Sequence, residues 1–281
     1  MSDGAYRWQG HAPEPDATRV AEIDAAWDDA QAHAFAEPAR AAAVERIERA
    51  LGAARTGDLT EAAAQLTHAR SVLESLRPES LEPRRGLAGL FDSRGARLRR
   101  FREGYQRAAT SLADAARDLS DRVDGTGRRS GALDGAWTEV RDTVADLDAH
   151  LAAASRRLPG NPPADGTAPH PLQARKEALD ACRAAALQSL PLIRGAQNAD
   201  ARTGEVLKAC TDGVDVWRED WKDALGLSGR RPKKVRADLV RMDRVRDDLL
   251  ARIDRATAEL TAARARRAEV EGRLADLRRP L

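Results

Sequence analysis

The sequence predicts an all-α protein, an elongated bundle of long antiparallel amphipathic helices with a coiled coil at its C-terminal end. Three observations predict this fold class. Apolar residues recur at three- and four-residue spacings along most of the 281-residue chain. Residues 232–279 keep a 3.5-residue apolar repeat. Aromatic residues make up only 4% of the chain whereas Asp, Glu, Lys and Arg make up 33%, a balance typical of helices that pack along narrow seams.

Composition also restricts the classes of function. The formal net charge is only +2, which lacks the strongly basic balance of a dedicated nucleic-acid binder, so nucleic acid is not an expected partner. Residues 1–15 do not resemble a secretion signal, and no stretch approaches the roughly 18 apolar residues of a membrane helix. We therefore expect a cytoplasmic protein with no membrane span.

The N-terminal part predicts a leader followed by short helices. Residues 1–17 are rich in Gly, Pro and polar side chains, which predicts a flexible leader. Residues 18–77 predict the N-terminal helices, the first over residues 18–34 and the others in an antiparallel αα-hairpin over residues 39–76. The hairpin is similar to one tetratricopeptide half-repeat, but a single copy cannot form a solenoid, so a plain helical hairpin is favoured.

Residues 86–227 predict a second helical region, interrupted by a Pro-rich loop at residues 159–171. The tripeptide Gly125-Thr126-Gly127 predicts a turn between its first two helices, and Pro191 predicts a kink in the third. The three expected helices span residues 96–123, 131–158 and 172–225.

The C-terminal coiled-coil helix, residues 232–279, gives the strongest structural signal. Its seam positions alternate in steps of four and three residues: Val235, Leu239, Met242, Arg246, Leu249, Ile253, Ala256, Leu260, Ala263, Arg267, Val270, Leu274 and Leu277. The partner of this seam is either another helix of the same chain or a second copy. Because buried charges need a partner or must reach solvent, Arg246 and Arg267 argue against a simple tight homodimer. Replacing both with leucine is expected to raise thermal stability or change the oligomeric state.

No catalytic, cofactor or metal site is predicted. The histidines lack the short spacings that place two ligands on one helix face; they are His11, His33, His68, His150 and His170. Cys182 and Cys210 lie too far apart for a CxxC pair and are expected to be buried free thiols. The chain has no Gly-rich phosphate loop and no HExxH sequence. We therefore expect a protein that is not an enzyme.

Two basic clusters could hold phosphates or an oxyanion, although solvated helix surface is the favoured interpretation. The first comprises Arg97, Arg99, Arg100, Arg102 and Arg107, and the second comprises Arg230, Arg231, Lys233, Lys234 and Arg236. Trp217 and Trp221 lie four residues apart on one helix face, a spacing that favours core packing over a ligand platform.

Two stretches resemble the toxic-anion (tellurite) resistance, TelA-like, family. Residues 187–198 read Leu-Gln-Ser-Leu-Pro-Leu-Ile-Arg-Gly-Ala-Gln-Asn and are followed by Trp217 and Trp221 within residues 216–222. Residues 89–106, from Gly-Leu-Phe to Arg-Phe-Arg-Glu-Gly-Tyr-Gln, are similar to the phenylalanine-to-tyrosine helix opening of that family. Family members usually carry a further proline before the first tryptophan, where this chain has Asp215 and Val216.

The resemblance implies a cytoplasmic helical protein associated with tellurite tolerance or stress tolerance that acts through partners. Its candidate interaction surface is Pro191, Arg194, Gln197, Asn198, Trp217 and Trp221. The polar members of this set could instead form a satisfied hydrogen-bond set between helices. The leading hypothesis is a non-enzymatic scaffold that binds protein partners, or itself, through the C-terminal helix. A coiled-coil adaptor unrelated to tellurite and a direct oxyanion-binding protein are the alternatives.

Overall fold

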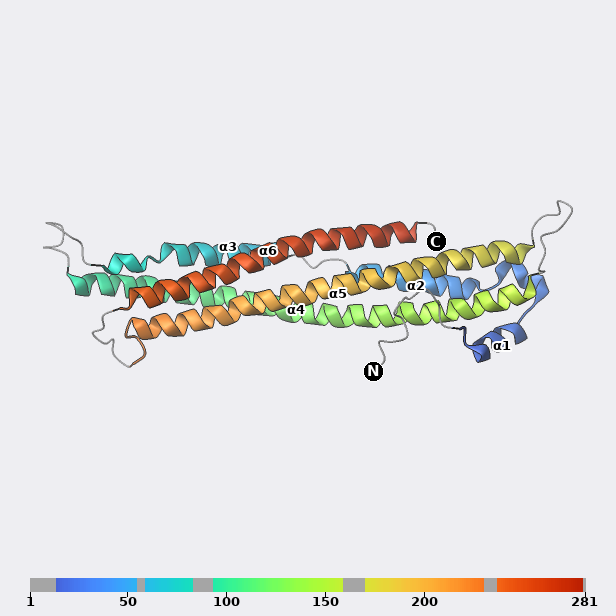
Figure 1. Cartoon of the computed structure of the whole chain (residues 1–281), viewed down its shortest axis with the longest axis horizontal. Coiled ribbons are helices and arrows are strands. Elements are labelled where there is room, and N and C mark those ends of the chain that lie inside the picture. The colour runs from blue at the N-terminus through green and yellow to red at the C-terminus, as the bar shows by residue number, and fades with distance from the viewer. Residues whose placement is uncertain (1–13, 55–58, 83–92, 159–169, 230–236, 280–281) are drawn as a thin grey trace. The chain divides into compact units, whose positions relative to one another are not determined.

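The computed structural model describes residues 14–54, 59–82, 93–158, 170–229 and 237–279, and their regular secondary structure is entirely helical. The predicted all-α fold class is therefore confirmed. The elements are α1 (Ala17–Ala25), the 3₁₀ helix η1 (Asp29–Ala34), α2 (Glu37–Ala54), α3 (Thr60–Ser75), the 3₁₀ helix η2 (Pro78–Leu81), α4 (Arg94–Arg157), α5 (Pro171–Ala224) and α6 (Leu239–Arg278) (Figure 1). Within the described ranges, no helix is apolar over enough of its length to cross a bilayer.

The chain forms two compact units, each assembled from separate stretches of sequence. Unit 1 comprises Met1–Arg55, Gly131–Gln197 and Ala268–Leu281, and unit 2 comprises Thr56–Ser130 and Asn198–Arg267. The helices α4, α5 and α6 each contribute residues to both units. The contiguous ranges predicted as domains therefore do not coincide with the units, because long helices let residues distant in sequence share a core.

The main core of unit 1 combines α2 with parts of α4, α5 and α6. Ile47 of α2, Leu133 and Val140 of α4, Ile193 of α5 and Leu274 of α6 are all buried in this cluster. Smaller clusters lie around Leu147 with Leu179, and around Val20 with Ala149.

The core of unit 2 contains aliphatic, aromatic and sulfur-containing side chains. Its fully buried members include Leu66 and Leu73 of α3, Leu112 of α4, and Trp217 and Trp221 of α5. The remaining helix, α6, adds Met242, Leu249, Ile253, Ala256, Leu260 and Ala263.

The seam predicted for the C-terminal helix is confirmed from Leu239 onward, where α6 begins, whereas Val235 lies outside the described residues. All buried residues of α6 occupy predicted seam positions, and all of them except Arg267 pack in cores formed by helices of the same chain. The partner of the seam is therefore intramolecular. Arg246 occupies its seam position by pairing with Asp243 at 3.0 Å and Asp247 at 3.2 Å, so its charge is compensated locally.

The predicted turn at Gly125-Thr126-Gly127 is wrong, because α4 continues through it without a break. The Thr126 hydroxyl donates to the Val123 carbonyl at 2.7 Å, and the Thr126 side chain is buried. Each glycine costs about 1 kcal/mol in a helix interior, whereas burying one leucine contributes about 1.5–3 kcal/mol. Leu119 and Leu133, on either side of the tripeptide, are both buried, and this burial outweighs the weak local signal.

The helices expected at residues 18–34 and 39–76 also differ from the structure. The first divides into α1 and η1, because the Asp28 side chain accepts a hydrogen bond from the Ala30 amide at 3.0 Å and caps a new turn. Residues 39–76 form α2 and α3, but the expected hairpin core is wrong. The apolar residues of α2 lie in the core of unit 1 and those of α3 in the core of unit 2, because each helix packs on the long helices of its own unit.

Several sequence interpretations fall on residues 1–13, 55–58, 83–92, 159–169 and 230–236, which lie outside the described residues. They include most of the expected leader, the Gly-Leu-Phe segment of the family resemblance, most of the Pro-rich loop and the second basic cluster. The long helix expected at residues 172–225 is confirmed as α5, which begins at Pro171 and continues through Pro191.

The glycines of α5 provide a matched test of helix packing. A Cβ atom at Gly213 would lie 2.8 Å from Arg252 Cδ and 3.1 Å from Leu249 Cδ1, whereas one at Gly195 meets no atom within 4 Å. We expect Gly213→Ala to lower the free energy of unfolding by about 1–3 kcal/mol through overpacking. Gly195→Ala should raise it by about 0.5–1 kcal/mol, since alanine favours the helix. Denaturant unfolding followed by circular dichroism at 222 nm measures both, and shifts of equal sign would contradict the close approach of α5 and α6.

Candidate functional site

The residues predicted as one interaction surface are divided between the two units and differ in exposure. Pro191, Arg194 and Gln197 belong to unit 1, while Asn198, Trp217 and Trp221 belong to unit 2. Pro191 and Asn198 are exposed, but the two tryptophans have no exposed surface. The shared helix α5 carries all of them at positions that point to different environments.

Arg194 and Gln197 are brought together as part of a satisfied polar set. Arg194 Nη1 donates to Asp134 Oδ1 at 2.7 Å and to Gln197 Oε1 at 2.6 Å. The Arg194 guanidinium also lies 4.2 Å from the centre of the Trp137 ring, a cation–π geometry. The interpretation of these residues as a hydrogen-bond set between helices is therefore confirmed for Arg194 and Gln197.

The two family-like tryptophans form the centre of an aromatic cluster in unit 2. The ring centroids of Trp217 and Trp221 are 5.1 Å apart, and Phe101 and Tyr105 of α4 pack against them. Trp221 Nε1 donates to the Met242 carbonyl at 3.0 Å, and the Tyr105 hydroxyl donates to the Arg218 carbonyl at 2.5 Å. Burial raises the pKa of Tyr105 to about 12. The core-packing interpretation of these tryptophans is confirmed.

The first basic cluster has a structural role in at least one member. Arg102 donates from Nε and Nη2 to the Leu225 carbonyl, at 2.9 Å and 2.5 Å, and so caps the C-terminal end of α5 with a positive charge. Arg99 and Arg100 are exposed. This cluster therefore contains one helix cap, Arg102, and at least two exposed side chains.

The two thiols and His150 likewise take structural places. Cys182 and Cys210 are buried free thiols, as predicted, and burial raises the pKa of Cys210 to about 11. The Nδ1 atom of His150 lies 2.8 Å from the Asp146 carbonyl, and its ring contacts Phe35. Within the described part of the chain, no cluster of three or more His, Cys, Asp or Glu side chains could hold a metal ion.

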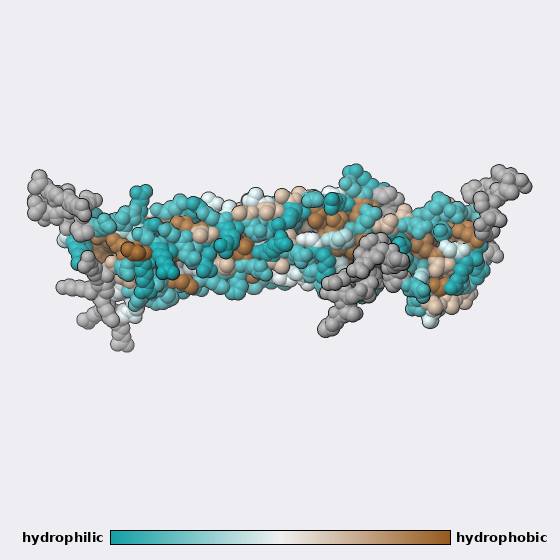
Figure 2. Space-filling view, in the orientation of Figure 1, coloured by the Kyte–Doolittle hydropathy of each residue, from teal (hydrophilic) through white to brown (hydrophobic). Residues whose placement is uncertain are grey.

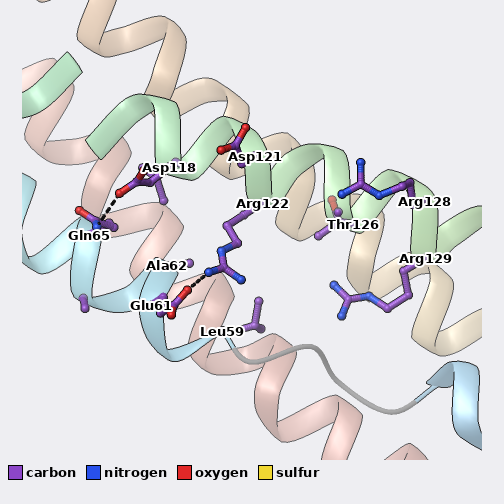
Figure 3. Close-up of a pocket in the computed structure, with 13 residues that line it drawn as sticks. Leu59, Glu61, Ala62, Gln65, Asp118, Asp121, Arg122, Thr126, Arg128 and Arg129 are labelled. Carbon is purple, nitrogen blue, oxygen red and sulfur yellow. Dashed lines mark hydrogen bonds and ion pairs between the residues drawn. The ribbon is translucent and has the colours of Figure 1, made fainter. Parts of the chain in front are cut away.

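Unit 2 has a groove between α3 and α4, here called the α3–α4 groove (Figure 3). It encloses about 690 Å³. Its floor contains the buried apolar residues Leu59, Ala62 and Leu119. Its charged lining residues are Glu61, Asp118, Asp121, Arg122, Arg128 and Arg129.

Polar contacts across the α3–α4 groove hold its two walls together at one end. Arg122 of α4 forms an ion pair with Glu61 of α3, and Gln65 Nε2 donates to Asp118 Oδ2 at 2.9 Å (Figure 3). Arg128 and Arg129 lie farther along α4, beyond Thr126, and their side chains extend along the groove. The groove therefore has a mixed-charge end and a basic end.

Arg129 connects the basic end of the groove to a buried ion-pair network. Asp200 of α5 is 1% exposed and pairs through Oδ1 with Arg267 of α6, which is 2% exposed. The second carboxylate oxygen of Asp200 lies 3.3 Å from Arg129 Nε. Burial lowers the pKa of Arg129, because its guanidinium loses hydration that the shared carboxylate replaces only in part.

Sequence reasoning identified only one member of this network. Arg267 was conspicuous because it interrupts an apolar seam, and a charge at that position requires an anionic partner. Asp200 and Arg129 resemble the many other charged residues on helix surfaces, and the groove joins Glu61 to Arg122, which are far apart in sequence. A search for acidic residues on the apolar face of α5 would have found Asp200, four residues after the buried Ala196.

No protein-family model, curated protein or solved structure matches this chain. The family resemblance of residues 89–106 and 187–222 therefore stays a prediction, and the candidate site rests on the geometry of the α3–α4 groove.

Proposed function

We propose that this protein is a non-enzymatic helical scaffold that binds a protein partner through the α3–α4 groove. The groove supports the proposal because it combines an apolar floor with charged walls of both signs, the chemistry that recognises a polypeptide segment. Self-association through the seam of α6 is not part of the proposal, since that seam is buried in the cores of the chain itself.

The surface of the described residues supports recognition by charge rather than by a broad apolar patch. Hydrophilic residues cover most of the visible face, with hydrophobic areas in separate small patches (Figure 2). Among the described residues, the large hydrophobic residues that are clearly exposed are Val216 and Val240. A partner that binds here would therefore bring complementary charges, which give specificity and a fast association rate.

The association with tellurite tolerance is the second part of the proposal, and the resemblance of residues 187–198 and 216–222 to the toxic-anion resistance family supports it. We propose a cytoplasmic location and action through the partner, without a cofactor. A coiled-coil adaptor with no role in tellurite tolerance is the competing function.

Growth in tellurite distinguishes these two functions. Deleting the encoding gene is expected to lower the tellurite concentration that halves the growth rate, and a plasmid copy of the wild-type chain should restore it. The matched control is growth of the same strains in sodium chloride at equal ionic strength, which should not differ. Equal tellurite tolerance with and without the gene would contradict the proposed role and favour the adaptor.

A further inference from the structure

The basic end of the α3–α4 groove offers guanidinium groups that the chain's own carboxylates do not fully engage. Arg128 is exposed and has no ion-pair partner among the residues that the structure describes. Arg129 shares the carboxylate of Asp200 with Arg267, and its Nε has no hydrogen-bond acceptor. By contrast, Asp118 at the other end already accepts a hydrogen bond from Gln65.

The electrostatic balance at this end favours an anion. Three arginines of α4 line the groove, and only Arg122 has a carboxylate partner within it, Glu61. Of the carboxylates on α4 that line the groove, Asp121 is the nearest to Arg128 and lies seven residues before it, which corresponds to about 10 Å along the helix axis. Asp124, four residues before Arg128, is exposed and does not line the groove. The first turn of α3 forms the opposite wall, where Leu59 gives no side-chain cap and the carboxylate of Glu61 is already paired with Arg122.

The dimensions of the groove favour a peptide over a small ion. A volume of about 690 Å³ is far larger than one phosphate or carboxylate requires, and the apolar floor of Leu59, Ala62 and Leu119 suits the methylene groups of a side chain. Adjacent arginines present several donors, and guanidinium groups bind carboxylates through paired hydrogen bonds.

We propose that Arg128 and Arg129 bind an acidic segment of the partner protein, whose aspartate or glutamate carboxylates accept hydrogen bonds from the two guanidinium groups. This inference rests on the proposed scaffold function and specifies the chemistry of its partner. Both walls of the groove belong to unit 2, so the site is complete within one unit.

A fluorescein-labelled hexaglutamate peptide tests this inference by fluorescence anisotropy with the purified full chain. The wild-type chain is expected to bind it with an affinity that falls as salt rises. Arg128→Glu should weaken binding at least tenfold, because it replaces an attractive charge with a repulsive one. Arg99→Glu is the matched control: it makes the same charge change on an exposed residue of the same helix outside the groove and should alter binding less than twofold.

A second variant of opposite sign protects the test from a general loss of folding. Asp121→Asn removes the α4 carboxylate of the groove lining that is nearest to Arg128 and should strengthen binding of the peptide by about twofold to fivefold. Circular dichroism at 222 nm should be the same for all three variants and the wild type.

Three results would overturn the inference. The first is no binding of hexaglutamate by the wild type, and the second is equal weakening of binding by Arg128→Glu and Arg99→Glu. The third is displacement of the peptide by inorganic phosphate far more effectively than by sodium chloride of equal ionic strength. The last result would mean that the groove takes free oxyanions. If the wild-type chain does not bind the peptide but tellurite tolerance still depends on the gene, this inference is wrong while the proposed role in tolerance is unaffected.

Discussion

Replacing Asp200 with alanine is expected to lower the free energy of unfolding by about 3–5 kcal/mol, because it removes the carboxylate from a buried ion pair. Asp200 and Arg267 are 1% and 2% exposed, so water cannot replace the lost partner of the guanidinium. Arg129 loses the same carboxylate. Denaturant unfolding followed by circular dichroism at 222 nm measures the change.

The control for this prediction is an ion pair of similar chemistry at the surface. Asp134 accepts a hydrogen bond from Arg194 at 2.7 Å, but the Asp134 side chain is 58% exposed. Asp134→Ala should therefore cost less than about 1 kcal/mol. Equal costs for the two alanine variants would show that Asp200 is hydrated in solution and would contradict its burial.

A double replacement separates the cost of breaking the pair from the value of having it. Apolar residues of similar volume often replace a buried ion pair without loss of stability. The variant with Asp200→Val and Arg267→Met should therefore recover most of the stability that Asp200→Ala loses. Arg267→Leu alone is expected to destabilise the protein, because it leaves the carboxylate of Asp200 buried without Arg267. For this residue the expectation is therefore the opposite of the gain in stability expected from the sequence.

The success and failure of sequence reasoning in this chain follow from the range over which each signal acts. The 3.5-residue repeat of α6 extends over many turns, so many residues independently indicate the same apolar face. The buried residues match the predicted seam for this reason. The turn expected at Gly125-Thr126-Gly127 rested on three residues, and burial of neighbouring leucines overrides a signal of that size.

The candidate site could not be predicted for a different reason. The α3–α4 groove depends on which helices become neighbours, and the sequence predicted that α3 would pack on α2 rather than on α4. With that pairing, Glu61 and Arg122 had no reason to meet. The tryptophans were correctly expected to be packed, because two indoles at a spacing of four residues mark a buried helix face in any arrangement.

Trp221→Ala is expected to have an equally large effect, a loss of about 3–5 kcal/mol in the free energy of unfolding. Trp221 is fully buried among Phe101, Tyr105 and Trp217, so its removal leaves a cavity that α4 and α5 cannot close without losing other contacts. Trp137→Ala is the control, since Trp137 is only partly buried and should cost clearly less. Denaturant unfolding again gives the measurement.

A pair of phenylalanine variants distinguishes packing from hydrogen bonding in the same cluster. Trp221→Phe and Trp217→Phe remove the same atoms from neighbouring buried positions, but Trp221 Nε1 donates to the Met242 carbonyl whereas Trp217 Nε1 has no acceptor within the described residues. Trp221→Phe should therefore cost about 1 kcal/mol more than Trp217→Phe, the net contribution of one buried hydrogen bond together with its orphaned carbonyl. Equal costs would mean that water reaches the Met242 carbonyl, and a greater cost for Trp217→Phe would mean that the Trp217 indole finds an acceptor in solution.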